Sequence, residues 1–284
     1  MEDLAGARPE YQKVRESFRE GESGNTIVPD RLTYRWWQFL CAVSVANILL
    51  WILAAWEVSR EADVYQFKQL MLSGLFVAAC AFRSILPRID LERMCLWDSR
   101  FSSVFLGRSV ATIAEMCFAL QCALLLVKLS HSTGASIIHT IGLSVLPIIF
   151  VAELACWCAV VTLNHIGHAM EELLWSIMVV LVATGLVIYY EQTGGGLPLW
   201  VAIGLIASAG TTALIMFVDI PLYIARWRTG RRAGLRYLRI RDGLKDALVR
   251  RQVTHASEHW RNDILWMSLY FSAGVWVSLV IVFV

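Results

Sequence analysis

The chain has 284 residues, of which 57% are apolar and only 17% are charged, and its formal net charge is +2. Soluble domains carry nearer to about 25% charged residues, so the apolar excess is large for this length. The apolar residues also fall in long blocks that are almost free of Lys, Arg, Asp and Glu. This pattern excludes a soluble enzyme, a nucleic-acid-binding domain and a disordered chain.

Seven of these blocks are long enough to cross a bilayer as helices. About 20 helical residues span the roughly 30 Å of hydrocarbon, and lipid offers no partner for unpaired backbone groups. We therefore predict an all-α, multi-pass integral membrane protein built as a bundle of seven transmembrane helices. In chain order, the predicted spans are 36–56, 64–83, 102–127, 137–163, 173–190, 199–220 and 264–284.

The basic residues predict how the bundle is oriented. Residues 1–35, 83–100 and 226–261 together hold 21 of the 25 Lys and Arg side chains. An excess of Lys and Arg in short connections marks the cytoplasmic side, so we expect the N-terminus in the cytoplasm and the C-terminus outside. The first 35 residues lack the apolar stretch of a cleavable signal peptide, and we expect the first span to act as its own insertion signal.

We expect one domain made of four segments: a polar cytoplasmic segment 1–35, a six-helix membrane part 36–227, a basic segment 228–261 and the seventh helix 262–284. The basic segment is predicted to form one or two cytoplasmic surface helices, broken near Asp242 and Gly243. Such a segment is expected to rest against anionic lipid headgroups. A docking surface for a cytoplasmic partner is the alternative. No nucleic-acid partner is expected.

Among the ionisable side chains of the predicted spans, three lie in the interior of the third and fourth spans. Arg108 and Glu115 share one face of the third span with Thr112, at the spacing i, i+4 and i+7, and Glu153 lies near the middle of the fourth span. A charged group in hydrocarbon is costly and is a functional candidate by default. We predict Arg108, Glu115 and Glu153 as catalytic residues. An internal ion pair that only fixes the helix register is the alternative.

Histidines and carboxylates gather where the predicted spans meet the cytoplasm. Neutral imidazole and carboxylate groups are ligands that Zn and non-haem Fe prefer. We therefore predict a Zn or non-haem Fe site, with ligands drawn from His165, His168, Glu171, Glu172, Asp219, His255 and His259. Helix capping, contact with lipid phosphate and ordinary solvated histidines are the alternatives. The seven cysteines form no CxxC pair and are interpreted as small buried apolar residues.

These features favour a metal-dependent membrane enzyme that acts on a lipid-like or amphipathic substrate from the cytoplasmic leaflet. In this hypothesis Arg108 holds an anionic headgroup or the negative charge that develops during the reaction. A non-catalytic membrane scaffold or partner-docking subunit is one alternative. A proton-coupled transporter, with Arg108, Glu115 and Glu153 as a relay, is another.

Overall fold

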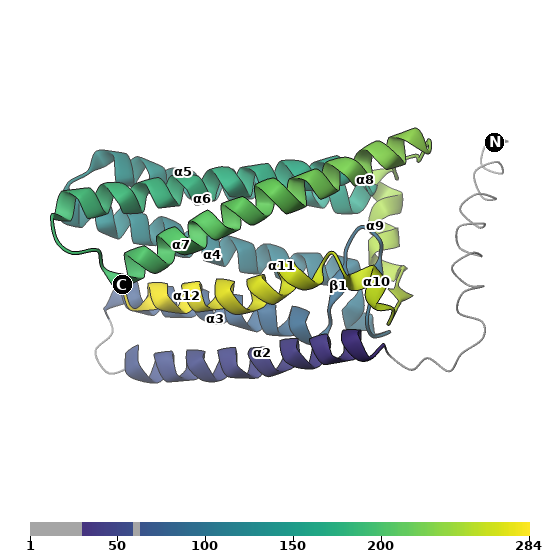
Figure 1. Ribbon diagram of the computed structural model, residues 1–284, viewed down its shortest axis with the longest axis horizontal. Coiled ribbons are helices and arrows are strands. Elements are labelled where there is room, and N and C mark those ends of the chain that lie inside the picture. The colour runs from purple at the N-terminus through teal and green to yellow at the C-terminus, as the bar shows by residue number, and fades with distance from the viewer. Residues whose placement is uncertain (1–29, 59–62) are drawn as a thin grey trace.

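The computed structural model describes residues 30–58 and 63–284 (Figure 1). Residues 1–29, which make up most of the expected N-terminal segment 1–35, and residues 59–62 lie outside the described part. Within it, seven helical stretches have the length and apolar composition needed to cross a membrane: Arg31–Val58, Val64–Ile85, Val104–Thr133, Ser136–Thr162, His165–Thr193, Leu199–Arg232 and Ile264–Val282. The predicted helical fold with seven helices long and apolar enough to cross a membrane is confirmed for the described residues, and each expected span overlaps one of these helices.

Helices that follow one another in the chain pack side by side. The first five are α2 (Arg31–Val58), α3 (Val64–Ile85), α4 (Val104–Thr133), α5 (Ser136–Thr162) and α6 (His165–Thr193). Short turns follow α4 and α6, and Gly134 and Gly194 in these turns adopt the left-handed conformation that commonly ends a helix. The next helix, α7 (Leu199–Leu214), packs against α6.

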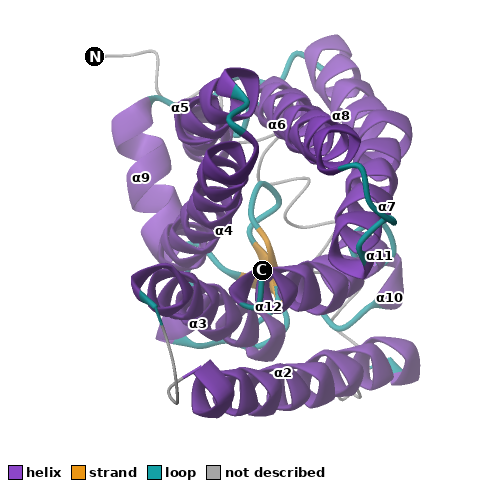
Figure 2. Cartoon of the chain, turned by 90° about the vertical axis from the view of Figure 1, so that its left-hand side faces the viewer, coloured by secondary structure: helices purple, strands orange, loops and turns teal. Residues whose placement is uncertain are grey.

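The seventh span closes the bundle against the first helices. It consists of α11 (Ile264–Leu269), a π-helical segment η3 (Tyr270–Gly274) and α12 (Val275–Val282), and α12 contacts α2, α3, α4 and α7. One apolar cluster joins α2 and α3 to this span, and a second joins α4, α5 and α6. Viewed along the bundle, the helices surround a central region (Figure 2).

The sixth span is longer than predicted. After α7 the helix continues through a π-helical segment, η2 (Ile215–Asp219), into α8 (Ile220–Arg232), so Pro221 lies within a continuous helical stretch. The π-helical turns lie just before Pro221, whose ring removes one regular helical hydrogen bond. In the seventh span, the Asn47 side-chain amide donates to the Phe271 carbonyl of η3 at 2.7 Å, so α2 supplies a partner for this irregular turn.

A small three-stranded sheet lies at one end of the bundle and was not predicted. Strands β1 (Arg88–Ile89) and β2 (Met94–Cys95) are antiparallel, β3 (Gln252–Val253) pairs with β2 in parallel, and a short 3₁₀ turn (Arg100–Ser102) leads into α4. Figure 2 shows the strands at the far end of the central region. Strands of two residues leave no alternating pattern that sequence reasoning can detect.

The basic segment 228–261 folds differently from the prediction. Helix α8 ends at Arg232, α9 spans Ile240–Val249, and a short α10 spans Ser257–Trp260. The predicted break near Asp242 and Gly243 is wrong, because α9 runs through both residues. Glycine stands at 243 because α9 packs onto α5, where an added Cβ would collide with the Val161 carbonyl. The buried Arg93 guanidinium also pairs with Asp246 of α9 at 2.9 Å.

Candidate functional site

The site begins with a pair of residues, two helical turns apart, on the same face of α4. The Ser103 hydroxyl accepts from the Leu106 amide and caps this helix, which places Arg108 near its start. Arg108 Nη2 lies 2.7 Å from Oε2 of Glu115, two turns further along the same face. Both side chains are buried, and Arg108 is only 4% exposed. The predicted shared face of α4 therefore produces a buried ion pair.

Glu153 on α5 faces the same guanidinium. Arg108 Nη2 lies 2.9 Å from Glu153 Oε2 and 3.1 Å from Oε1. The Thr112 hydroxyl donates to Glu153 Oε2 at 2.6 Å, and the Trp157 indole donates to that hydroxyl at 3.0 Å. These contacts fix the orientation of the Glu153 carboxylate.

Helix α6 adds the third carboxylate and a histidine. Leu163, whose backbone is in the left-handed conformation, ends α5, and Asn164 caps α6. Helix α6 therefore starts at His165, whereas the predicted span started at residue 173. Glu171 Oε1 lies 3.5 Å from Arg108 Nη2, and Glu171 Oε2 lies 2.6 Å from His168 Nδ1. The two polar residues thus face α4 and α5.

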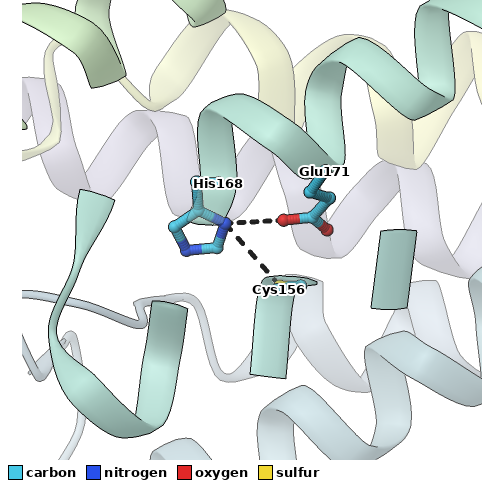
Figure 3. Close-up of side chains that lie close together, drawn as sticks. All are labelled: Cys156, His168 and Glu171. Atoms are coloured by element: carbon cyan, nitrogen blue, oxygen red, sulfur yellow. Dashed lines mark hydrogen bonds and ion pairs between the residues drawn. The ribbon is translucent and has the colours of Figure 1, made fainter. Parts of the chain in front are cut away.

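Cys156 of α5 completes this part of the site. Its Sγ lies 3.6 Å from Nδ1 of His168, and Figure 3 shows the same ring nitrogen of His168 facing both the Glu171 carboxylate and Cys156. The close approach of α5 and α6 depends on Gly167, where an added Cβ would lie 2.7 Å from the Ala155 carbonyl oxygen. Cys158, two residues further on, is exposed.

The cluster carries more negative than positive formal charge. Glu115, Glu153 and Glu171 all contact the single Arg108 guanidinium, and all four side chains are at least nine-tenths buried. One positive charge cannot balance three carboxylates in a medium of low dielectric constant, where uncompensated charge is strongly unfavourable. The excess has to be neutralised by bound protons or by a cation.

Two groups of ligand atoms in the described residues are compact enough to hold a metal ion. The first contains Cys156, His168 and Glu171, and the second contains Glu115, Glu153 and Glu171. In each group the atoms lie within 4.8 Å of one another, and all of these residues are buried. The first group combines sulfur, nitrogen and oxygen donors, which is a ligand set that zinc accepts.

The other predicted ligands lie elsewhere. Glu172 and Asp219 line the cavity described below, and the His165 ring is stacked 6.4 Å from that of Tyr223. His255 packs edge-on against Trp97, and the His259 Nδ1 atom lies 2.7 Å from the Thr254 hydroxyl, next to β3. None of these residues belongs to a metal-ligand group in the described part of the chain.

A cavity of about 590 Å³ adjoins the cluster inside the bundle. Arg108, Glu115, His168 and Glu171 belong to its wall. Further charged residues line the same end, namely Arg83, Arg88, Asp90, Glu92, Glu172, Asp219, Arg226 and Asp263. The wall beyond them is largely apolar and includes Leu125, Met178, Val182, Leu186, Ile203 and Val277. The cavity is therefore polar at one end and apolar along most of its length.

Several polar atoms in the wall are buried without a hydrogen-bond partner among the described residues. The donors are Arg88 Nε, Arg108 Nε and Tyr270 Oη, and the acceptors are Asp90 Oδ1, Glu92 Oε2 and Asp263 Oδ2. Buried polar atoms are nearly always satisfied by protein, water or ligand. Their concentration at the polar end gives this part of the cavity the capacity to hydrogen-bond a polar group.

Sequence reasoning missed several residues of the site. Cys156 was interpreted as a small apolar residue, and only the packing of α6 onto α5 brings it to His168. Asp263 precedes the seventh span and is 7% exposed, and burial raises the pKa of its carboxyl to about 6 although Trp266 and Arg226 oppose the shift. Tyr223 stacks on His168 at 5.0 Å. The position of Asp263 at a span boundary was the only available signal.

Comparison of the chain with protein-family models, with curated proteins and with solved structures gave no match.

Proposed function

We propose that this protein is a membrane-embedded, metal-dependent enzyme that acts on the polar head of a lipid-like substrate. The observation that supports it is the position of Cys156, His168 and Glu171 beside Arg108, at the polar end of an otherwise apolar cavity. Costly polar groups are collected at one place where an amphipathic molecule has room to bind.

The donor set fits zinc. Bond lengths of about 2.0–2.3 Å at a tetrahedral zinc place its ligand atoms about 3.3–3.5 Å apart. The separation between Cys156 Sγ and His168 Nδ1 is 3.6 Å, and that between His168 Nδ1 and Glu171 Oε2 is 2.6 Å. The second pair has to open by less than about 1 Å to reach this spacing. A zinc ion with three protein ligands retains an open position, where it polarises a substrate oxygen or lowers the pKa of a bound water.

The surrounding residues have separate tasks. Arg108 lines the cavity, and its Nε has no partner among the described residues, so it faces an anionic head or a developing negative charge. Glu115 also lines the cavity and is placed to move a proton to or from the bound head group. Glu153, which is held by Thr112, keeps the guanidinium in position.

The cavity's polar end is proposed to face the cytoplasmic leaflet. Arg88 of β1, Arg93 in the turn before β2 and the Arg-rich segment after α8 lie at this end, which is the cytoplasmic side by the distribution of Lys and Arg. Leu235, Ile240 and Val249 are exposed among the basic residues of this segment. Apolar and basic side chains together suit the headgroup boundary of an anionic membrane.

The metal content of the purified full-length protein tests the proposal. We expect one zinc ion per chain by inductively coupled plasma mass spectrometry after purification in detergent and incubation with zinc. Cys156→Ala and His168→Ala are expected to lose it. Cys158→Ala is the matched control, because this thiol lies on the same helix but is exposed, and it should retain the metal.

Activity is followed in liposomes made from a total lipid extract. Wild type and Cys158→Ala should convert a lipid to a product that mass spectrometry detects, whereas Cys156→Ala should not. Zinc content that is absent from the wild type, or unchanged in both Cys156→Ala and His168→Ala, contradicts the proposal.

A proton-coupled transporter is the second candidate, because protons can neutralise the carboxylates as well as a metal ion can. The excess negative charge around Arg108 is the observation that favours it. It predicts a proton flux into liposomes that Glu153→Gln abolishes, with no metal in the wild type. Stoichiometric zinc together with no flux excludes this alternative.

A further inference from the structure

The cavity is long. Along α6 its wall runs from His168 to Leu186, which at 1.5 Å per residue is about 27 Å and nearly the thickness of the hydrocarbon core. Its volume of about 590 Å³ falls in the range of about 300–1,000 Å³ that ligand-binding cavities commonly have. The cavity is therefore long enough for an extended hydrocarbon chain.

The cavity opens sideways between the sixth and seventh spans. Ile206 and Gly210 of α7 and Leu269 of α11 line the cavity and are also exposed; Ile206 is 73% exposed and Leu269 is 45% exposed. Figure 1 shows α7 starting beside the end of α12, which it contacts, and then diverging from α11 towards α8. Exposed residues at mid-span face the acyl chains of the bilayer. The opening therefore connects the cavity with lipid.

The rim of this opening has little side-chain bulk. An added Cβ at Gly210 meets no atom within 4 Å, and one at Gly274 meets only Phe76, at 4.0 Å. Gly274 ends the π-helical segment η3, and η2 on the facing span begins with the cavity residue Ile215. Irregular helical turns of this kind are frequent at functional sites.

We infer that the ligand of this cavity is an amphiphile whose hydrocarbon chain enters from the bilayer between α7 and α11. Its chain lies along the apolar wall and its head reaches the end lined by Arg108 and Tyr270. The unpartnered wall atoms include both donors and acceptors, which suits a head group with hydroxyls. This inference rests on the proposed function and names the head group and the entry route of its substrate.

Binding of spin-labelled lipids tests the inference. The full-length protein is reconstituted in phosphatidylcholine liposomes, and a monoacylglycerol with a nitroxide on its acyl chain is added as the probe. Electron paramagnetic resonance should show a saturable immobilised component for the monoacylglycerol, at one per chain.

Two substitutions that fill the cavity check where the probe binds. Gly210→Phe and Gly274→Phe should each weaken binding of the monoacylglycerol by on the order of tenfold or more, because the new ring occupies the path of the chain. Gly196→Phe is the control, since Gly196 lies in the connection between α6 and α7, away from the cavity, and an added Cβ there meets no atom within 4 Å.

The outcomes separate this inference from the proposed function. Cys156→Ala is expected to lose zinc and still immobilise the monoacylglycerol, so loss of either property alone identifies which idea fails. The absence of a saturable immobilised component in the wild type overturns the inference without recourse to any variant. Unchanged binding in both glycine variants, with their thermal unfolding retained, overturns it as well.

Discussion

Glu171 links His168 to Arg108: its Oε2 lies 2.6 Å from His168 Nδ1, and its Oε1 lies 3.5 Å from Arg108 Nη2. The guanidinium also contacts Glu115 and Glu153, so one cation from α4 holds carboxylates of α4, α5 and α6 together. The candidate site is therefore also part of what joins three helices. Changes to its charge should alter stability as well as function.

Arg108→Met should destabilise the protein by about 3–5 kcal/mol, because it leaves three buried carboxylates without their cation. Adding Glu115→Gln to this variant should recover part of the loss, since it removes one of the repelling charges. Unfolding in detergent, followed by circular dichroism, measures both effects. Arg241→Met on the exposed face of α9 is the control and should change stability by less than about 0.5 kcal/mol. A similarly small effect of Arg108→Met would contradict the assignment of a shared ion cluster.

Gly243→Ala should loosen the contact between α9 and α5. The added methyl group would overlap the Val161 carbonyl, and overpacking of this kind costs about 1–3 kcal/mol or more. Gly230→Ala in α8 is the matched control, because the nearest atom there is Leu235 Cδ1, at 3.5 Å. Alanine is favoured over glycine inside a helix by about 1 kcal/mol, so the control should be neutral or stabilising. Limited proteolysis of the 228–261 segment should be faster in Gly243→Ala only.

Asp263 should make stability depend on pH. Burial raises the pKa of its carboxyl from 3.8 to about 6, and Glu92 and Asp90 act in the same direction. A carboxyl with a raised pKa stabilises the fold fully at a pH below its ordinary value, and this contribution is lost as the pH rises through about 6. Relative to Asp263→Asn, the wild type should therefore lose up to about 3 kcal/mol between pH 4 and pH 7. A constant difference in unfolding temperature between the two proteins across this range would contradict the prediction.

Reporter fusions should determine the orientation of the bundle. If the basic end is cytoplasmic, alkaline phosphatase fused after Gly195 or after Val284 should be active, and the same enzyme fused after Arg236 should be inactive. Green fluorescent protein at these positions should give the reverse pattern. Activity only at Arg236 would mean that the bundle is inserted the other way round, and that the cavity's polar end faces the opposite leaflet.

The amino-acid sequence was sufficient to predict the seven helices, and the helical spacing on α4 placed Arg108 and Glu115 on one face. Both results follow from local rules, because hydrocarbon demands long apolar helices and an α-helix repeats every 3.6 residues. The start of α6 was predicted too late, since polar residues such as His168 and Glu171 lower the apolar signal although Asn164 caps the helix there. Polar residues had the same effect in the sixth span: the arginines of α8 hid how far this helix extends.

Only the tertiary structure decided which polar residues meet. Cys156 and His168 come together because Gly167 allows α5 and α6 to approach closely, whereas His255 and His259 pack near β3, beside Trp97 and Thr254. The cavity likewise depends on how α7 diverges from α11, which no short segment encodes. Contacts between helices are set by the shape and packing of many side chains at once, so they cannot be derived from the periodicity of any one helix.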